Sequence, residues 1–259
     1  MIEFPTAATF AAVAAEPRFI GAAAVAVLAG VVRGFSGFGS ALIYVPLMSA
    51  IYEPRIATVS FVIPDYFSSA PYLVQAFRHC HWRAVLPAFL AAALAVPFGT
   101  MTQMSADPDL LRWGMAVFVA LFVILLAAGW RYPGPTGTGG AIGAGMLSGF
   151  AGGATQMSGP PLILFWLGSS DPAAMIRANL MACLGLIGLL LCVSYIVQGL
   201  VTAQPIAIAV MLWPAYVLSV VAGARWFRGT SDRGYRRVGY AIIAASAVVS
   251  LPIFDTWLR

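Results

Sequence analysis

Long apolar stretches separated by short polar segments dominate the pattern along the chain. A helix that crosses a bilayer needs about 20 mostly apolar residues. Stretches of this length cover residues 56–76, 84–104, 110–130, 173–197, 205–227 and 236–254. Residues 18–52 and 141–168 are also apolar, but glycines interrupt both segments, so that each is too long for one span while its arms are short. The pattern predicts an all-α polytopic membrane protein.

The two interrupted segments match each other under one constant shift along the chain. Residues 34–47 and 149–162 align without a gap, each with glycines first and a proline near the end. The identical pairs are Ala26/Ala141, Ala29/Ala144, Gly30/Gly145, Gly34/Gly149, Phe35/Phe150, Gly37/Gly152, Pro46/Pro161 and Leu47/Leu162. An acid–proline pair follows each segment, Glu53-Pro54 and Asp171-Pro172. We therefore interpret the chain as an internal duplication.

The duplication divides the chain into two repeats within one integral membrane domain. Residues 131–140 are rich in glycine and proline, which is typical of a turn-rich linker. The first repeat then covers residues 1–130 and the second covers residues 141–259. Each repeat consists of one Gly-broken helical segment followed by three transmembrane helices.

The placement of arginine bears on how the repeats are oriented. Short cytoplasmic loops collect Arg, and the two Arg-rich loops are residues 77–83 and 225–237. These loops lie on opposite faces if each broken segment crosses the membrane once. They share a face if the second broken segment is a hairpin that crosses twice or dips in and returns. A hairpin gives each half an odd number of crossings, so the charge pattern favours inverted repeats.

Composition excludes several classes of protein. The 259 residues are 61% hydrophobic and 9% charged, with a mean hydropathy of +0.90, whereas soluble domains carry about 25% charged residues. The net charge of +5 comes from Arg in loops, without the clustered basic face that nucleic-acid binding needs. Cys80, Cys183 and Cys192 show no disulfide or metal-site spacing. We expect no nucleic-acid partner, no cofactor and no metal.

The glycine breaks are the best candidates for a binding site. Glycine lets the backbone leave the helix and lets a ligand approach backbone amides. At membrane depth, non-helical backbone survives only where it is buried in protein or lines a wet cavity. Paired interruptions in two halves of a chain are typical of transporter binding sites. The alternative is that the glycines serve tight helix packing.

Polar residues around the breaks suit a small anion. The guanidinium of Arg33 fits a tetrahedral oxyanion, and helix arms that start near Ser40 and Ser158 would point positive dipole ends at the breaks. The candidate substrate-binding residues are Arg33, Gly34, Ser36, Gly37, Gly39, Ser40, Gly152, Thr155, Gln156, Ser158, Arg177 and Asn179. We expect this site between the two motifs, near the bilayer midplane. The alternatives are snorkelling for Arg33, helix capping for the hydroxyls and loop anchoring for Arg177.

Asp65 is the acid inside a full predicted span, next to Pro64. Acids that face the protein interior within a membrane often relay protons or pair with arginine. Asp65 is therefore a candidate for proton coupling. The alternative is a structural ion pair with Arg33 or Arg177.

At residues 34–46 and 149–161 the chain resembles the sulfite exporter TauE/SafE family of membrane transporters. The first motif has the family's Gly-x-x-Gly-x-Gly pattern at Gly34, Gly37 and Gly39, whereas the second has Ala154 where a third glycine is common. The resemblance extends over essentially the whole chain. It implies transport of small sulfur-containing anions such as sulfite, sulfoacetate or other organosulfonates.

We therefore expect a secondary transporter and not an enzyme. Its partners would be a small anionic substrate and the lipid bilayer, in a bacterial inner membrane, and a homodimer is compatible with the sequence. The glycine motif lacks the Gly-Lys-Ser/Thr of a P-loop, which argues against pumping by ATP within this chain. Two alternatives stay open at this point: a passive anion channel, and an intramembrane enzyme that uses Asp65 on a lipid-soluble substrate.

Overall fold

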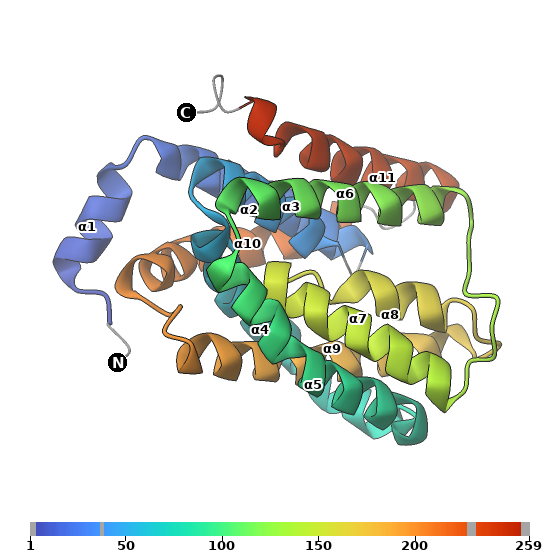
Figure 1. Ribbon diagram of the computed structural model, residues 1–259. Helices are drawn as coiled ribbons and strands as arrows, with labels where there is room; N and C mark the ends of the chain where they lie inside the picture. Colours follow the sequence, from blue (N-terminus) through green and yellow to red (C-terminus); the bar gives the residue numbers. More distant parts are fainter. Residues whose placement is uncertain (1–3, 37–38, 227–231, 255–259) are drawn as a thin grey trace. The chain divides into compact units, whose positions relative to one another are not determined.

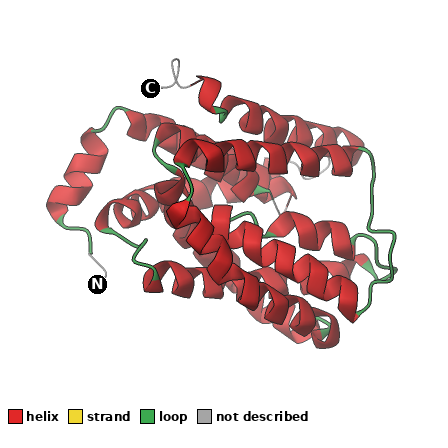
Figure 2. Ribbon diagram, in the orientation of Figure 1, coloured by secondary structure: helices red, strands yellow, loops and turns green. Residues whose placement is uncertain are grey.

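The computed structural model describes residues 4–36, 39–226 and 232–254. Within these ranges the chain is helical and contains no strand (Figures 1 and 2). The helices are α1 (Ala7–Ala15), α2 (Arg18–Ser36), α3 (Ser40–Ile51), α4 (Pro54–His79), α5 (Trp82–Ser105), α6 (Pro108–Ala127), α7 (Thr138–Thr155), α8 (Gly159–Trp166), α9 (Ala173–Val197), α10 (Ala203–Trp226) and α11 (Asp232–Val249), followed by a 3-10 turn, η1 (Pro252–Phe254). The all-α prediction is confirmed.

Among the described residues, four helices are long and apolar enough to cross a membrane: α5, α6, α9 and α10. They confirm the predicted apolar spans 84–104, 110–130, 173–197 and 205–227. A fifth candidate arises if α1 and α2, which meet at 90°, are taken as one bent span. The predicted spans 56–76 and 236–254 coincide with α4 and α11, but charged and polar residues lower the hydropathy of both helices. Their membrane crossing stays a prediction.

Helix ends follow local signals in the sequence. The Asp107 carboxylate accepts hydrogen bonds from the backbone N–H groups of Asp109 at 2.9 Å and Leu110 at 3.3 Å. It therefore caps the start of α6, where Pro108 takes a position that needs no N–H donor. Gly129 and Gly199, with φ of 69° and 70°, follow α6 and α9 in the left-handed conformation that commonly ends helices.

The chain forms two compact units. The first contains Met1–Pro64, Ala106–Ala127 and Gly199–Arg259, and the second contains Asp65–Ser105 and Ala128–Gln198. Each unit holds one Gly-broken segment together with helices from both predicted repeats. The border between the units falls inside α4, between Pro64 and Asp65. The repeat boundaries themselves stay a prediction.

In the first unit, the broken segment α2–α3 folds back on itself. At the open end, the guanidinium carbon of Arg18 lies 4.4 Å from the centroid of the Tyr52 ring, just beyond α3. At the tip, Arg33 Nη1 donates a hydrogen bond to Ser40 Oγ at 3.2 Å. The start of α2 therefore lies beside the end of α3, and the two helices form a hairpin.

In the second unit, α7 and α8 form the corresponding hairpin (Figure 1). At its tip, the Ser148 hydroxyl donates to the carbonyl oxygen of Ser158. At its open end, the rings of Tyr132 and Phe165 lie with centroids 5.5 Å apart, and the Tyr132 N–H donates to the Leu164 carbonyl at 3.4 Å. At 1.5 Å per residue α8 is only about 12 Å long, which is too short to cross a hydrocarbon core of about 30 Å.

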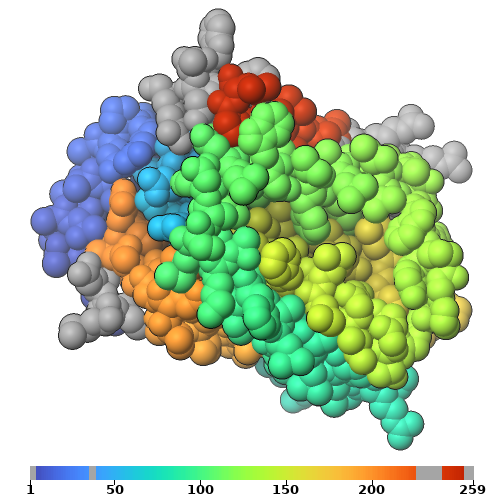
Figure 3. Space-filling model, viewed as in Figure 1, coloured from blue at the N-terminus to red at the C-terminus, as the bar shows by residue number. Residues whose placement is uncertain are grey.

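Glycines bring each long hairpin arm against another helix of its unit. In the first unit α2 packs on α10, and in the second unit α7 packs on α5 (Figures 1 and 3). A Cβ on any of these glycines would overlap the partner backbone, at these pairs: Gly30 on Tyr216, Gly34 on Val220, Gly145 on Ala88, Gly149 on Ala92 and Gly153 on Val96. The helix-packing alternative is confirmed for these positions. Residue numbers rise together along both pairs, so the paired helices run parallel.

Polar contacts fix the direction of two further pairs. In the second unit, α5 and α9 run parallel, because the His81 N–H donates to Asn179 near their starts and Thr100 contacts Ser194 further along, with Oγ atoms 2.9 Å apart. In the first unit, α6 and α11 lie side by side and run antiparallel (Figure 1). Arg112, near the start of α6, donates from Nε at 3.1 Å and from Nη2 at 2.9 Å to the carbonyl of Ser250, just after α11.

Candidate functional site

The first break separates α2 from α3 by residues 37–39. Gly39 has a φ of 89°, a left-handed conformation that favours glycine. Gly39 is the N-cap of α3, and because glycine has no side chain it offers no capping hydrogen bond to the first turn of that helix. Gly37 lies outside the described residues, and the side chain of Ser36 is likewise not described. Their predicted contact with substrate stays a prediction.

Arg33 and Ser40 meet at this first tip, and their contact with substrate stays a prediction. Ser40 is 1% exposed and Arg33 is half-buried. A cation inside a membrane protein is costly unless it pairs or serves a ligand. A guanidinium carries N–H donors in a planar fork that suits an oxyanion. The tip of the first hairpin therefore combines positive charge with a buried hydroxyl.

The second break follows Thr155 and is organised differently. Gln156 ends α7 with a φ of 61°, which among the described residues makes it the one non-glycine in the left-handed region. Its backbone N–H donates to the Gly152 carbonyl at 2.7 Å. A bulky residue held in this conformation carries backbone strain, and such strain gathers at functional sites.

Ser158 supplies a buried hydroxyl at the second tip. Its side chain is 6% exposed, and its Oγ has no hydrogen-bond partner within the part of the chain that the structure describes. A buried polar group without a partner costs about 1–3 kcal/mol. A Cβ at Gly152 would overlap Ser158 Oγ, so glycine at position 152 makes room for this hydroxyl.

Tyr195 joins the second tip from α9, although the sequence analysis did not include it. Its phenol is 1% exposed and lies 3.4 Å from both the Gly152 carbonyl oxygen and Gln156 Oε1. The tip thus gathers Gly152, Gln156, Ser158 and Tyr195. The sequence shows a tyrosine within the apolar span 173–197, and this could have marked Tyr195 as a candidate. Its contact with the second break, however, becomes visible only once α9 is known to lie beside α7.

The remaining candidates have other contacts. Thr155 Oγ1 donates to the Ala151 carbonyl of its own helix at 2.8 Å. Asn179 is 0% exposed, and its Oδ1 accepts the His81 N–H at 2.7 Å, which anchors the loop between α4 and α5. Arg177 is exposed. Asp65 is half-buried on α4, and its backbone carbonyl accepts the Ser69 hydroxyl at 2.8 Å.

The two short helices, α3 and α8, differ in the free backbone N–H groups that their first turns can offer to a ligand. Pro160 and Pro161 occupy the start of α8, and proline has no N–H. The start of α3 has no proline, although the Leu42 N–H already donates to the Gly39 carbonyl at 3.1 Å. The predicted set of free backbone donors is therefore smaller at Ser158 than at Ser40, and side chains matter more at the second tip.

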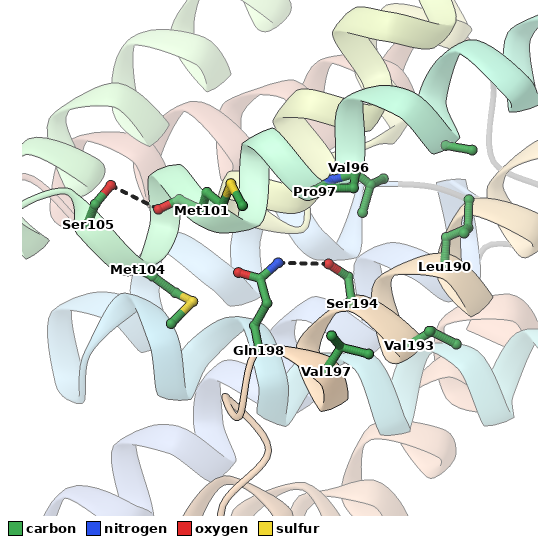
Figure 4. A pocket seen from close by; sticks show the side chains of 11 residues that line it. Val96, Pro97, Met101, Met104, Ser105, Leu190, Val193, Ser194, Val197 and Gln198 are labelled. Carbon is green, nitrogen blue, oxygen red and sulfur yellow. Dashed lines mark hydrogen bonds between the residues drawn. The ribbon is translucent and has the colours of Figure 1, made fainter.

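An elongated cavity of about 730 Å³ lies between α5 and α9 in the second unit (Figure 4). Its lining residues are uncharged and mostly apolar: Ala93, Val96, Pro97, Met101, Met104, Ser105, Leu190, Val193, Ser194, Val197 and Gln198. Gln198 Nε2 donates to Ser194 Oγ at 3.0 Å, and this amide also bonds Thr100. The Ser105 hydroxyl donates to the Met101 carbonyl of its own helix, and Gln198 Oε1, which has no hydrogen-bond partner among the described residues, is an acceptor. The lining therefore suits an apolar molecule better than an anion.

Metal-binding side chains do not cluster in the described ranges, which contain no group of three or more His, Cys, Asp or Glu. The candidate ligand-binding groups at the hairpin tips are therefore hydrogen-bond donors and one arginine.

Comparison with known proteins finds a matching family and a similar bacterial protein. The family model described as "Sulfite exporter TauE/SafE" matches residues 22–250. A protein of Cupriavidus necator, named "Probable sulfite/organosulfonate exporter TauE", is 26% identical over 232 residues, which cover 86% of this chain and 90% of that protein. No solved structure matches the chain.

Proposed function

Because the chain belongs to the sulfite exporter TauE/SafE family of membrane transporters, we propose that it is a secondary transporter of small sulfur-containing anions. The family match bears out the resemblance seen in the glycine motifs. Sulfite, sulfoacetate and other organosulfonates are the proposed substrates, and the name of the Cupriavidus necator relative supports this chemistry. That bacterial relative also supports a bacterial inner membrane. A homodimer receives no support from the comparisons.

The observation that carries the proposal is the buried hydroxyl of Ser158 at a helix break. Its Oγ is without a hydrogen-bond partner among the described residues, and it lies beside the strained Gln156. An oxyanion supplies the acceptor that this donor lacks. At the other break, the cation of Arg33 reaches Ser40 and adds charge for the same class of ligand. We propose that both hairpin tips take part in substrate binding.

We further propose that the two repeats are inverted in the membrane. Each repeat has a hairpin, which returns to its starting face, followed by three predicted spans, so the chain crosses an odd number of times per repeat. This path makes α6 and α11, which are equivalent helices, antiparallel, and it makes α5 and α9 parallel. Both directions agree with the contacts within the units. A path with single-crossing broken segments would reverse both relations.

Thiol labelling tests this topology. The loop 77–83 contains Cys80, and part of loop 225–237 lies outside the described residues. Burial raises the pKa of the Cys80 thiol. Since the thiolate is the reactive form, labelling is best done above neutral pH.

In a Cys183→Ala, Cys192→Ala background, we expect Cys80 and a cysteine replacing Gly229 both to resist a membrane-impermeant maleimide in intact cells. Both should react in inverted vesicles. Labelling of only one of the two from outside would refute the inverted arrangement.

Ligand binding and flux test the function itself. Purified protein should bind sulfite or sulfoacetate, and proteoliposomes should show saturable counterflow of the bound anion. Counterflow distinguishes a transporter from a passive channel, in which a gradient of unlabelled anion drives no uphill movement of label. Absence of binding to every sulfite and sulfonate tried would overturn the proposed substrate class.

A further inference from the structure

The cavity between α5 and α9 is an open apolar groove along the second half of both helices. Its lining residues recur at helical spacing, at 93, 97, 101 and 104 on α5 and at 190, 193 and 197 on α9, so each helix contributes one face. Met101, Val193 and Val197 are each more than half exposed. Exposed apolar side chains gathered in one patch mark contact with a membrane or a partner, and on two membrane spans the surrounding medium is lipid.

Gln198 lies at one end of this groove, and hydrogen bonds fix the orientation of its amide. The Thr100 hydroxyl donates to the Val96 carbonyl of its own helix at 3.1 Å, which leaves Thr100 Oγ1 as the acceptor for the Ser194 hydroxyl 2.9 Å away. Because both hydroxyl protons are then used, the amide group that contacts these two oxygens is the donor, Nε2 of Gln198. Figure 4 shows this nitrogen toward Ser194 and the amide oxygen turned away from it.

The amide oxygen of Gln198 is therefore an acceptor that lacks a donor. Oε1 is buried and has no hydrogen-bond partner among the described residues. Such buried acceptors are rare, because leaving one unsatisfied costs free energy. The Ser105 hydroxyl, also in the lining, already donates to the Met101 carbonyl at 2.9 Å. A ligand of the groove would thus be mainly apolar and would supply one hydrogen-bond donor near Gln198.

The depth of the groove fits one leaflet of a bilayer. Helices α5 and α9 run parallel, and Ser105 and Gln198 lie at their ends. At 1.5 Å per residue, the stripe from Ala93 to Ser105 is about 18 Å long, and half of a hydrocarbon core is about 15 Å thick. An acyl chain that starts at the membrane surface near Gln198 would therefore follow the stripe to about the midplane.

The charges next to the polar end indicate the kind of head group. The segments that follow the two helices, residues 106–107 and 198–202, contain the acid Asp107 and no Arg, Lys or His. Basic side chains are what bind anionic lipid head groups at a membrane surface. An ammonium group, in contrast, carries N–H donors and is attracted by a carboxylate.

We propose that the α5–α9 groove binds one phospholipid of the surrounding bilayer. Its acyl chain lies between the two apolar stripes, and its ethanolamine ammonium donates a hydrogen bond to Gln198 Oε1. The flexible side chains of Met101 and Met104 adapt the groove to the chain. This lipid site is distinct from the hairpin tips and does not depend on which anion the protein transports.

Native mass spectrometry of the delipidated full-length protein in detergent tests the head group. The probes are phosphatidylethanolamine, phosphatidylcholine and phosphatidylglycerol with the same palmitoyl and oleoyl chains. The choline ammonium has no N–H, and phosphatidylglycerol is anionic. We expect phosphatidylethanolamine to bind at least about fivefold more tightly than either, the effect of about one hydrogen bond. Gln198→Met, which removes the amide at similar length, should reduce this preference to less than about twofold.

A matched pair of tryptophan variants tests where the lipid lies. Val193 and Ile196 are both on α9 and are 56% and 46% exposed, but Val193 lines the groove and Ile196 does not. Val193→Trp should fill the groove and weaken phosphatidylethanolamine binding at least about tenfold, whereas Ile196→Trp should change it less than about twofold. Equal losses in the two variants would overturn the groove as the site. Thermal unfolding checks that each variant is folded.

The other outcomes are equally decisive. Equal binding of the three lipids by the wild-type protein, or an unchanged preference in Gln198→Met, would overturn the proposal. A dimer that dissociates on Val193→Trp, without lipid binding by the wild type, would assign the groove to a second copy of the chain instead. None of these results bears on sulfur-anion transport, and a protein that binds no sulfur anion would still be expected to bind this lipid.

Discussion

The two glycine hairpins follow the same path but are built differently at their tips. Both have a long arm that packs on another helix through glycine, and both return along a shorter arm. The left-handed residue is Gly39 in the first, just before the short arm, and Gln156 in the second, just after the long arm. The first tip carries the cation Arg33, and the second carries neutral donors.

This difference has a simple origin in the repeated sequence. The shift that aligns Gly34 with Gly149 places Ala154 opposite Gly39. Alanine disfavours the left-handed conformation that Gly39 adopts, because its Cβ meets the following carbonyl oxygen. Helix α7 therefore continues through Ala154, and the chain turns at Gln156. A gapless sequence match thus conceals a displaced break.

The largest effect is expected where glycine serves helix packing in both hairpins. Gly149→Val would force side-chain atoms into the backbone of Ala92, so we expect a loss of more than about 4 kcal/mol of stability. The matched control is Gly143→Val on the same helix, where an added Cβ meets no atom within 4 Å. The yield of monodisperse protein and its thermal unfolding measure both. Equal yields from the two variants would contradict the packing role.

The Gly152→Val variant cannot by itself show whether the backbone at the second tip binds substrate. A Cβ at position 152 overlaps Ser158 Oγ, so a loss of binding would reflect displacement of that hydroxyl as well as any block of the backbone. Ser158→Ala is the sharper probe of the second tip. Gly37→Val keeps its predicted loss of binding at the first tip.

The next effect tests the charge difference between the tips. Arg33→Ala removes a charged donor from the first tip, and we expect sulfonate affinity to fall about tenfold to a hundredfold, the range for hydrogen bonds to charged groups. Arg18→Ala is the matched control, because Arg18 lies at the open end of the same hairpin and pairs with Glu16 at 2.8 Å. Calorimetry on folded protein measures both. Similar losses in the two variants would remove the specific role of Arg33.

A substitution outside both hairpins separates coupling from binding. Asp65 lies on α4, and we expect Asp65→Asn to impair proton-linked transport about tenfold while leaving substrate affinity nearly unchanged, since membrane acids often relay protons. Uptake into proteoliposomes with and without a pH gradient is the measurement. Normal transport across pH would mean that Asp65 is structural and that any proton coupling lies elsewhere.

The smallest effect is expected at Thr155, the hydroxyl next to Gln156. Its Oγ1 already donates to the Ala151 carbonyl within α7, and such a local bond leaves little for a ligand. Thr155→Ala should change methanesulfonate affinity by less than about twofold, within the usual range of neutral substitutions. A loss of affinity as large as that of Ser158→Ala would show that Thr155 also belongs to the ligand-binding residues of the second tip.

The sequence by itself determined the elements of this protein. Apolar length identified the spans 84–104, 110–130, 173–197 and 205–227, because a helix that crosses lipid must satisfy its backbone internally and cover itself with apolar side chains. Glycine and proline located both breaks, since these residues act on the local backbone. The same motifs pointed to the family, which the family match confirmed.

Only the tertiary structure decided what those elements contact. The hairpin path depends on pairs such as Arg18 with Tyr52, which lie far apart in sequence. Tyr195 reaches Gln156 only because α9 lies beside α7, and the buried Arg112 holds the end of α11 through the Ser250 carbonyl. Among uniformly apolar helices many pairings bury similar surface, and lipid gives no hydrophobic preference among them. Glycine contacts and a few polar bonds therefore select the arrangement, and these become visible only when the helices are packed.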